Sequence, residues 1–335
     1  EGIHAADPQA QTIVNSGGWL HYGFYERLIR EDNVAFDIIG WHWYSEMGDV
    51  TRAGGVNVYE HLKAFGKPIW VTECNRRGGS LGGQTAEQAN YLAEEARRWT
   101  AGPEPMAQAF FAYELLDEPY FGPDNPESHY GLVAIRKGLD NQWRVSQRKE
   151  AFHALQALFL GTAATPPVYP ALEPVRAARP GQNPFGTQTT CLVEGHEAGR
   201  IAAFLDDIAG VGYGWVKDYV HGGEVRPDED LAAAWTEFPA RYEEYLRAAA
   251  DRHLRVLLRV DAPRSPGEEP ASPRACAAYA RFCQALVQRF KPWVHDWELE
   301  NEPNIGNETP RLRPEDYVAL ARAAASDLPQ SRAGR

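Results

Sequence analysis

Cysteine is scarce in this sequence, and none of it is spaced as in a metal site. The 335 residues include four, at positions 74, 191, 276 and 283, whereas zinc ligands usually come in pairs roughly two to four residues apart. Cys276 and Cys283 fall in one expected helix, about 10 Å apart along its axis, which is too far for a disulfide. We therefore expect free thiols and no bound metal.

Long apolar runs and an excess of positive charge are also lacking. No run approaches the roughly 18 apolar residues of a membrane span, and no charged-then-apolar leader opens the sequence. Acidic residues outnumber basic residues 46 to 34, and the net charge is -12. Because binding to a phosphate backbone needs a basic stripe, we expect neither a nucleic-acid partner nor a membrane.

Aromatic residues are plentiful instead, with 10 Trp and 15 Tyr. Hydrophobic residues make up 44% of the chain, enough for a large core, and core packing accounts for most of the aromatic side chains. Flat aromatic rings also stack on the apolar faces of sugars. The composition is therefore compatible with a carbohydrate ligand.

Strand-like runs alternate with amphipathic helical stretches along the chain, a pattern typical of a parallel sheet with helical crossovers. Eight runs have strand character: 11–14, 36–43, 68–72, 107–113, 186–191, 213–217, 255–260 and 296–301. Residues 161–182 form a Pro/Ala-rich linker with four strands on each side, too few to close a barrel alone. We predict one α/β domain over 1–335, a (β/α)8 TIM barrel, with a tail at 326–335.

Two of these strands end in carboxylates. Residues 297–304 read Trp-Glu-Leu-Glu-Asn-Glu-Pro-Asn, and residues 67–73 read Lys-Pro-Ile-Trp-Val-Thr-Glu. Active sites of such barrels lie at the carboxyl ends of the strands, so both segments would point side chains into the catalytic face.

Two aromatic strands accompany them. In 36–44, Phe-Asp-Ile-Ile-Gly-Trp-His-Trp-Tyr, the two-residue period of a strand places His42 and Tyr44 on the same face. Residues 110–119, Phe-Phe-Ala-Tyr-Glu-Leu-Leu-Asp-Glu-Pro, are followed by His-Tyr-Gly-Leu at 129–132.

Together these motifs resemble the clan A retaining glycoside hydrolases, of the family 5 and family 39 type. The resemblance implies that Glu302 is the acid/base and Glu73 the nucleophile. It further implies that Asn301 binds the sugar 2-hydroxyl, that His42 contacts the acid/base or the substrate, and that Tyr44 donates a hydrogen bond to the nucleophile. The mechanism needs no metal or other cofactor.

The chain departs from the family pattern at two positions. Where the family has a sugar-stacking tryptophan on its eighth strand, this sequence has Ala112, and Tyr113, Trp19 or Trp43 could substitute for it. Lys217 stands where the family usually has arginine.

The order of the motifs also differs. The family places Asn-Glu-Pro on the fourth strand and the nucleophile on the seventh, whereas here the nucleophile motif comes first. We therefore predict a circular permutation, in which the chain starts at the helix before the fifth strand. Residues 1–160 would supply strands five to eight and residues 183–325 strands one to four, and the chain ends should meet within one split helix.

One feature allows two explanations. Strict alternation would put Glu298, Glu300 and Glu302 on one face, a heavy negative load for a barrel interior. Either the strand is distorted there, or Arg259 and Lys217 compensate the charge. We also expect repulsion between the two catalytic carboxylates, together with desolvation, to raise the pKa of the acid.

The function that this resemblance implies is retaining hydrolysis of a β-linked oligo- or polysaccharide, endo-acting, by a monomer. The substrate class favours a secreted or periplasmic protein, although the sequence shows no signal peptide. Two alternatives stay open: a catalytically silent carbohydrate-binding barrel, and a piece of a tandem array whose halves pair between molecules.

Overall fold

The computed structural model describes residues 3–138, 143–160, 183–189, 198–221, 238–262, 269–303 and 312–325. The predicted linker at 161–182 and the tail at 326–335 lie outside these ranges. None of the helices in the described ranges is long and apolar enough to cross a membrane.

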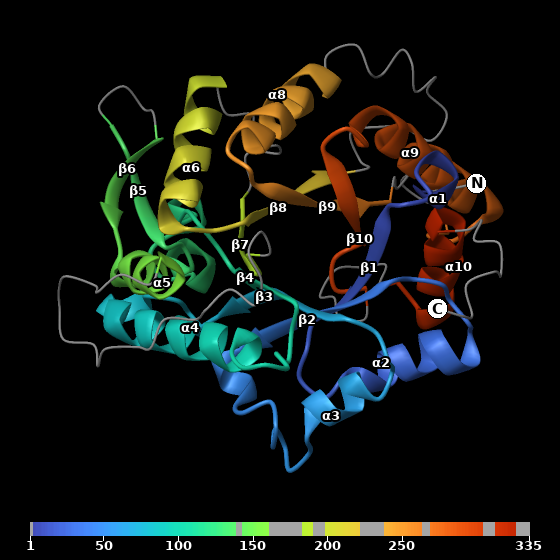
Figure 1. The fold of residues 1–335 in the computed structure, drawn as a ribbon, viewed down its shortest axis with the longest axis horizontal. Coiled ribbons are helices and arrows are strands. Elements are labelled where there is room, and N and C mark those ends of the chain that lie inside the picture. Colours follow the sequence, from blue (N-terminus) through green and yellow to red (C-terminus); the bar gives the residue numbers. More distant parts are fainter. Residues whose placement is uncertain are drawn as a thin grey trace.

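A closed barrel of parallel strands forms the centre of the molecule, in the order β1-β10-β9-β8-β7-β4-β3-β2 (Figure 1). All eight expected strands are present, with shifted ends. Their bounds are β1 (Gln11–Ser16), β2 (Ile38–Tyr44), β3 (Ile69–Asn75), β4 (Ala109–Ala112), β7 (Phe185–Gln188), β8 (Trp215–His221), β9 (Arg255–Asp261) and β10 (Val294–Leu299). The predicted TIM barrel is confirmed.

The barrel closes within a single chain. Strand β4 pairs with β7, and β10 pairs with β1, so the two halves of the sequence meet at both seams. The segments 68–72 and 296–301 belong to the same barrel, as predicted. No strand of the barrel is left without its neighbour, which argues against the alternative in which halves pair between molecules.

Helices surround the barrel (Figure 1). They are α1 (Ile3–Ala6), α2 (Tyr22–Glu26) with a π-helical turn over Arg27–Glu31, α3 (Val58–Lys63), α4 (Thr85–Thr100), α5 (Glu150–Leu160), α6 (Ala198–Val211), α8 (Phe238–Asp251), α9 (Pro273–Phe290) and α10 (Pro314–Ala325). Helix α9 shows how the sequence starts such an element: Ser272 caps it by accepting a hydrogen bond from the Ala275 N–H, and Pro273 occupies its first turn.

The first and last helices lie together. Helix α1 packs against α9 and α10, and Ile3 is buried in the same cluster as Tyr317 and Leu320 of α10. That is the contact expected if one helix were split between the chain ends. The permutation relative to the family order stays a prediction.

The barrel interior changes character along its axis. Toward the amino ends of the strands it is filled by apolar side chains, Ile13, Ile38, Trp70, Ala109, Phe111, Trp215 and Leu257. Trp70 and Trp215 meet edge to face, with ring centroids 4.8 Å apart. Toward the carboxyl ends the buried side chains become polar and charged. The apolar plug therefore forms the floor beneath a polar site.

One element was not expected from the sequence. Strands β5 (Val133–Lys137) and β6 (Trp143–Arg148) form an antiparallel hairpin between β4 and α5. Most of the β6 side chains are exposed, so this segment lacks the alternation of buried apolar residues that indicates a strand.

Candidate active site

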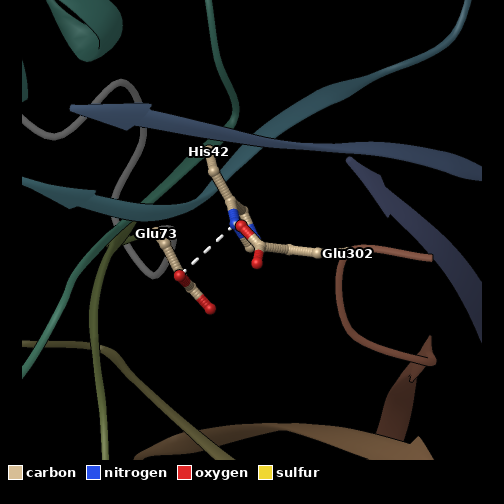
Figure 2. Close-up of side chains that lie close together, drawn as sticks. All are labelled: His42, Glu73 and Glu302. Atoms are coloured by element: carbon tan, nitrogen blue, oxygen red, sulfur yellow. Dashed lines mark hydrogen bonds and ion pairs between the residues drawn. The ribbon is translucent and has the colours of Figure 1, made fainter. Parts of the chain in front are cut away.

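His42 lies between two glutamates at the carboxyl ends of the strands (Figure 2). The parallel register of β2 and β3 sets His42 beside Glu73. The His42 Nδ1 atom lies 2.9 Å from Glu302 Oε1 and 3.3 Å from Glu73 Oε2. Three residues from distant parts of the sequence therefore meet around one ring nitrogen.

The two carboxylates are close but differently exposed. One oxygen of Glu73, one oxygen of Glu302 and a ring nitrogen of His42 lie within 4.8 Å of one another. The Glu73 side chain is 8% exposed and that of Glu302 is 32% exposed. Carboxyl groups about 5 Å apart are typical of retaining glycosidases, whereas inverting enzymes leave roughly 6.5 to 9.5 Å for a water molecule.

Tyr44 supports Glu73 from the same face of β2 as His42. Its hydroxyl donates a hydrogen bond to Glu73 Oε2 at 3.2 Å, which is the contact predicted from the two-residue spacing. Burial raises the pKa of Tyr44 well above its ordinary value, and the charge of Glu73 raises it further. The phenol thus stays protonated and remains a donor.

Lys217 brings a positive charge close to the carboxylates of Glu73 and Glu298. It is fully buried, with Nζ 3.5 Å from Glu73 Oε1 and 3.1 Å from Glu298 Oε1. The same nitrogen lies 3.4 Å from the Thr72 carbonyl oxygen and can donate to it. One ammonium group therefore balances two carboxylates inside the barrel.

Both explanations for the three glutamates at the end of β10 hold. Glu298 stays in the interior, where Lys217 compensates its charge. Beyond Leu299 the strand ends, and Glu300 and Glu302 take left-handed φ angles of 59° and 41°. The Glu300 carboxylate turns aside to accept a hydrogen bond from the Ala262 N–H. The distortion separates side chains that a regular strand would have placed together.

Asn15 is a residue of the site that sequence reasoning missed. Its Oδ1 accepts a hydrogen bond from the Glu302 N–H at 2.8 Å, and its Nδ2 donates to Glu298 Oε1. Gly40 on β2 makes room for it, since a Cβ there would lie 2.9 Å from the Asn15 Cβ. The available signal was a polar residue directly after the apolar run at the end of the predicted strand 11–14.

Glu127 is a second residue that was missed. It follows β4 in the 3-10 helix η5 (Pro126–His129), and the Tyr113 hydroxyl donates to its Oε2 at 3.2 Å. Burial raises the pKa of Glu127, the Tyr113 hydrogen bond opposes this, and the charges of Glu73 and Glu302 raise it further. Glu127 is therefore a third carboxyl group within electrostatic reach of the pair.

The aromatic residues predicted to contact substrate separate into two groups. Trp43 is fully buried on the outer side of β2, packs against Trp99 and donates its indole N–H to the Gly48 carbonyl oxygen at 3.0 Å. It cannot stack on a sugar, because alternation along β2 turns it away from His42 and Tyr44. Trp19 is 36% exposed in the loop after β1.

Tyr113 and Asn301 both lie at this end of the barrel. The Tyr113 ring contacts Tyr44 edge to face, with centroids 6.5 Å apart. The Asn301 Oδ1 atom is buried and has no hydrogen-bond partner within the described ranges. A buried acceptor of this kind is suited to a hydroxyl donor from a ligand.

The electrostatics of Glu302 differ from the sequence-based expectation. Burial raises its pKa, but the hydrogen bond and charge of His42, together with the charges of Lys217 and Arg259, outweigh burial and lower the pKa below its ordinary value. The prediction of a raised pKa considered repulsion by Glu73 and desolvation. It was wrong because it left out the His42 hydrogen bond and the positive charges of Lys217 and Arg259, which other strands bring to the site.

His42, Glu73 and Glu302 could also hold a metal ion, judged by their spacing alone. Lys217 and Tyr44 already satisfy both oxygens of Glu73, so a cation would have to compete with an ammonium group 3.5 Å away. The expected absence of a metal stays a prediction.

Comparison with known proteins gives one family match. Residues 3–113 match a family model described as the glycosyl hydrolase catalytic core. This stretch runs from α1 through β4 and contains His42, Tyr44, Glu73 and Tyr113. A search of curated proteins found no match.

Several solved structures are similar in part. A trimodular endoglucanase of glycoside hydrolase family 5, subfamily 4, aligns with a TM-score of 0.49 and 9% identity over 96% of this chain, which spans 62% of that chain's length. An endo-β-1,4-mannanase of family 26 from Cellulomonas fimi aligns with a TM-score of 0.44 and 11% identity. The alignment covers 95% of this chain and 72% of the mannanase chain. A family 99 endo-α-mannosidase from Bacteroides thetaiotaomicron aligns with a TM-score of 0.43 and 12% identity. The alignment covers 94% of this chain and 95% of the mannosidase chain.

Proposed function

We propose that this chain, a glycoside hydrolase whose residues 3–113 match the glycosyl hydrolase catalytic core, cleaves β-linked polysaccharides internally with retention of anomeric configuration. The observation that carries the proposal is the carboxylate pair: oxygens of Glu73 and Glu302 lie within 4.8 Å of each other at the carboxyl ends of the strands. That spacing is closer to the roughly 5 to 5.5 Å of retaining enzymes than to the roughly 6.5 to 9.5 Å that leaves room for the water of an inverting mechanism.

In the first step Glu73 acts as the nucleophile. Its carboxylate attacks the anomeric carbon, the bond to the leaving oxygen breaks, and Glu302 transfers its proton to that oxygen. Tyr44 and Lys217 each contact one oxygen of Glu73 and thereby orient it. The more exposed Glu302 is the better placed of the two to meet the leaving group.

In the second step Glu302 acts as the base. It takes a proton from water, the water oxygen bonds to the anomeric carbon, and the ester bond to Glu73 breaks. Once Glu73 is esterified its negative charge is gone, so the neighbouring cations lower the pKa of Glu302 further. Two inversions give net retention.

The low pKa of Glu302 has a consequence for the first step. General acid catalysis needs the protonated form, and the His42 hydrogen bond favours the ionised form. We therefore expect the pH optimum to lie on the acid side of neutrality. Asn301, with its buried acceptor, is assigned to the sugar 2-hydroxyl, and Tyr113 to the wall of the sugar site.

The remaining features of the proposal follow from the architecture and substrate class. A barrel that closes within one chain can act as a monomer. A polysaccharide substrate favours a location outside the cytoplasm. The proposed partner is a glycan, with neither nucleic acid nor membrane.

The test uses the two carboxylates separately. Glu73→Ala should abolish hydrolysis of every substrate, because no other group supplies the attacking atom. Glu302→Ala should lose polysaccharide hydrolysis yet still react with an activated aryl glycoside, and added azide should restore turnover and yield a β-glycosyl azide.

Two outcomes would contradict the proposal. An α-glycosyl azide from Glu302→Ala would exclude β-retaining chemistry. Wild-type protein that binds β-glucans, xylans, mannans or galactans but cleaves none of them would be a carbohydrate-binding barrel without activity.

A further inference from the structure

Large exposed aromatic side chains gather at the carboxyl ends of the barrel strands. Within the described ranges the exposed large apolar residues are Trp19 at 36%, Tyr120 at 50%, Phe121 at 51%, Val145 at 44% and Leu160 at 51%. The three aromatic ones follow β1 and β4, whereas Val145 lies on β6 and Leu160 ends α5. Exposed aromatic surface beside a site is a common mark of ligand binding.

Trp19 lies on the Glu302 side of the site. Its strand, β1, pairs with β10, which leads into Glu302, and Asn15 of β1 binds the Glu302 backbone at 2.8 Å. The loop also rests on the end of β2, since a Cβ on Gly18 would lie 2.0 Å from the His42 carbonyl oxygen. The backbone beside Trp19 therefore rests on His42, in the loop that follows the strand between β10 and β2.

Tyr120 and Phe121 lie on the Glu73 side. They belong to the 3-10 helix η4 (Pro119–Phe121) in the loop after β4, and β4 pairs with β3, the strand of Glu73. Their ring centroids are 4.8 Å apart. The two rings are tilted by 45° to each other, and both are exposed.

The loop that carries this aromatic pair is tied to the site. Ser128 Oγ lies 3.0 Å from the Glu118 carbonyl oxygen and 2.6 Å from that of Gly122, one on each side of the pair. Ser128 follows Glu127, whose carboxylate accepts a hydrogen bond from Tyr113. The charges of Glu73 and Glu302 raise the pKa of Glu127. The aromatic pair and Glu127 therefore belong to one loop, which these hydrogen bonds stabilise.

We propose that Trp19 and the Tyr120–Phe121 pair are sugar-binding platforms on the two sides of the cleaved bond. The inference rests on the proposed function, because Glu302 must face the leaving sugar and Glu73 the sugar that it attacks. Trp19 then stacks on a sugar of the leaving portion, and Tyr120–Phe121 stack on a sugar of the portion retained on Glu73. A chain held on both sides is cleaved internally.

The experiment separates the two sides with aryl glycosides. The probes are 4-nitrophenyl β-glycosides of one to four sugars from the cello-, laminari-, manno- and xylo-series. The release of 4-nitrophenol is measured, because it reports only cleavage events in which all sugars lie on the retained side. The double variant Tyr120→Ala/Phe121→Ala should lose about three- to tenfold in kcat/KM on the longer probes and nothing on the monosaccharide probe. Trp19→Ala should match wild type on every probe, but lose about three- to tenfold on the unmodified oligosaccharides and polysaccharide.

Controls keep the outcome unambiguous. Val145→Ala removes a similarly exposed apolar side chain away from the site and should match wild type on all substrates. Trp19→Gly suits the left-handed φ of 54° at this position and should reproduce Trp19→Ala if only the ring matters. Circular dichroism melting shows whether each variant is folded.

The inference is overturned if a folded platform variant loses equally on short and long probes, if the two variants exchange their patterns, or if Val145→Ala reproduces either loss. Wild-type protein that cleaves no probe and no polysaccharide contradicts the proposed function itself, and the platform assignment falls with it. Cleavage by wild type with unchanged kinetics in both platform variants contradicts the platforms alone.

Discussion

At the residue scale, His42 is the point at which both carboxylates converge, because a single ring nitrogen lies within 3.3 Å of each. Its position could be read from the two-residue period of β2, and so could that of Tyr44. The lowered pKa of Glu302 could not, since it depends on charges that the barrel brings in from other strands. Local pattern shows which face a side chain occupies, and tertiary structure determines its electrostatics.

Replacing His42 should move the pH profile. In His42→Phe the hydrogen bond and charge that lower the pKa of Glu302 are gone, so burial, which raises that pKa, has less opposition. The alkaline limb of kcat/KM, where protonated Glu302 is lost, should therefore shift to higher pH, measured with an aryl glycoside whose poor leaving group needs protonation. Tyr44→Phe should reduce the rate without this shift. A limb that stays in place or moves to lower pH in His42→Phe would contradict the assignment.

Replacing Asn15 should weaken acid catalysis selectively. Asn15→Leu keeps much of the volume but removes the acceptor that holds the Glu302 backbone in its left-handed conformation. A lost hydrogen bond of about 1 kcal/mol corresponds to roughly a fivefold lower kcat. The loss should be largest for substrates with poor leaving groups, compared across a series of aryl glycosides. Equal losses on good and poor leaving groups would indicate a general packing defect instead.

At the element scale, the eight barrel strands were predictable because each is a short apolar run ending in turn residues. The carboxyl end of β10 was less predictable. The sequence Glu-Leu-Glu-Asn-Glu continues a strand pattern, but left-handed φ angles at Glu300 and Glu302 end the strand at Leu299. The β5–β6 hairpin was missed because its second strand is exposed. Trp43 was misassigned although the alternation that places His42 and Tyr44 on the site face already turns it to the outer side of β2.

Helix α4 carries a buried carboxyl group, that of Glu95, whose titration should affect stability. Glu95 is buried against the barrel, accepts from the Trp99 indole N–H at 3.1 Å and lies 3.0 Å from Arg98. Burial raises the pKa of Glu95 from 4.5 to about 7, although Arg98 and Trp99 oppose it. Between these two values the folded state holds more protons than the unfolded state, so stability should fall as pH rises.

Glu95→Gln should remove that pH dependence. The wild-type free energy of unfolding should decrease by up to about 3 kcal/mol from pH 5 to pH 8 through this group, and the variant should show a flatter profile. Urea unfolding at the two pH values measures both. Glu94→Gln, at an exposed neighbouring position, is the matched control and should behave as wild type. A wild-type stability that rises through Glu95 over this range would refute the prediction.

At the scale of the whole molecule, the circular order of the strands explains how motifs in reversed sequence order can form one site. Counting from β10 through β1 and β2 to β3 gives three steps around the closed barrel between Glu302 and Glu73. The family separation of the fourth and seventh strands is also three steps. The predicted permutation would change where the chain is cut but leave this separation intact.

The two halves should depend on each other. Residues 1–160 contain β1 to β4 and residues 183–325 contain β7 to β10, so either half alone exposes two unpaired strand edges. Expressed separately, 1–160 and 161–335 should be unfolded or aggregated, and together they should form a one-to-one complex with the far-ultraviolet circular dichroism of the intact chain. Size-exclusion chromatography measures whether the separate halves aggregate and whether the mixture forms the one-to-one complex. A monomeric 1–160 with a cooperative unfolding transition would show that the halves are independent.

The most direct test of the account is the site of covalent attachment during turnover. A 2-deoxy-2-fluoro analogue of the best substrate, with an activated leaving group, should slow the second step and let the glycosyl-enzyme accumulate. Mass spectrometry of the intact protein and of its peptides should then show one fluoroglycosyl group on the peptide that contains Glu73, and none in Glu73→Ala. A label on Glu302 or Glu298, or efficient hydrolysis of the parent substrate with no covalent species, would contradict the account.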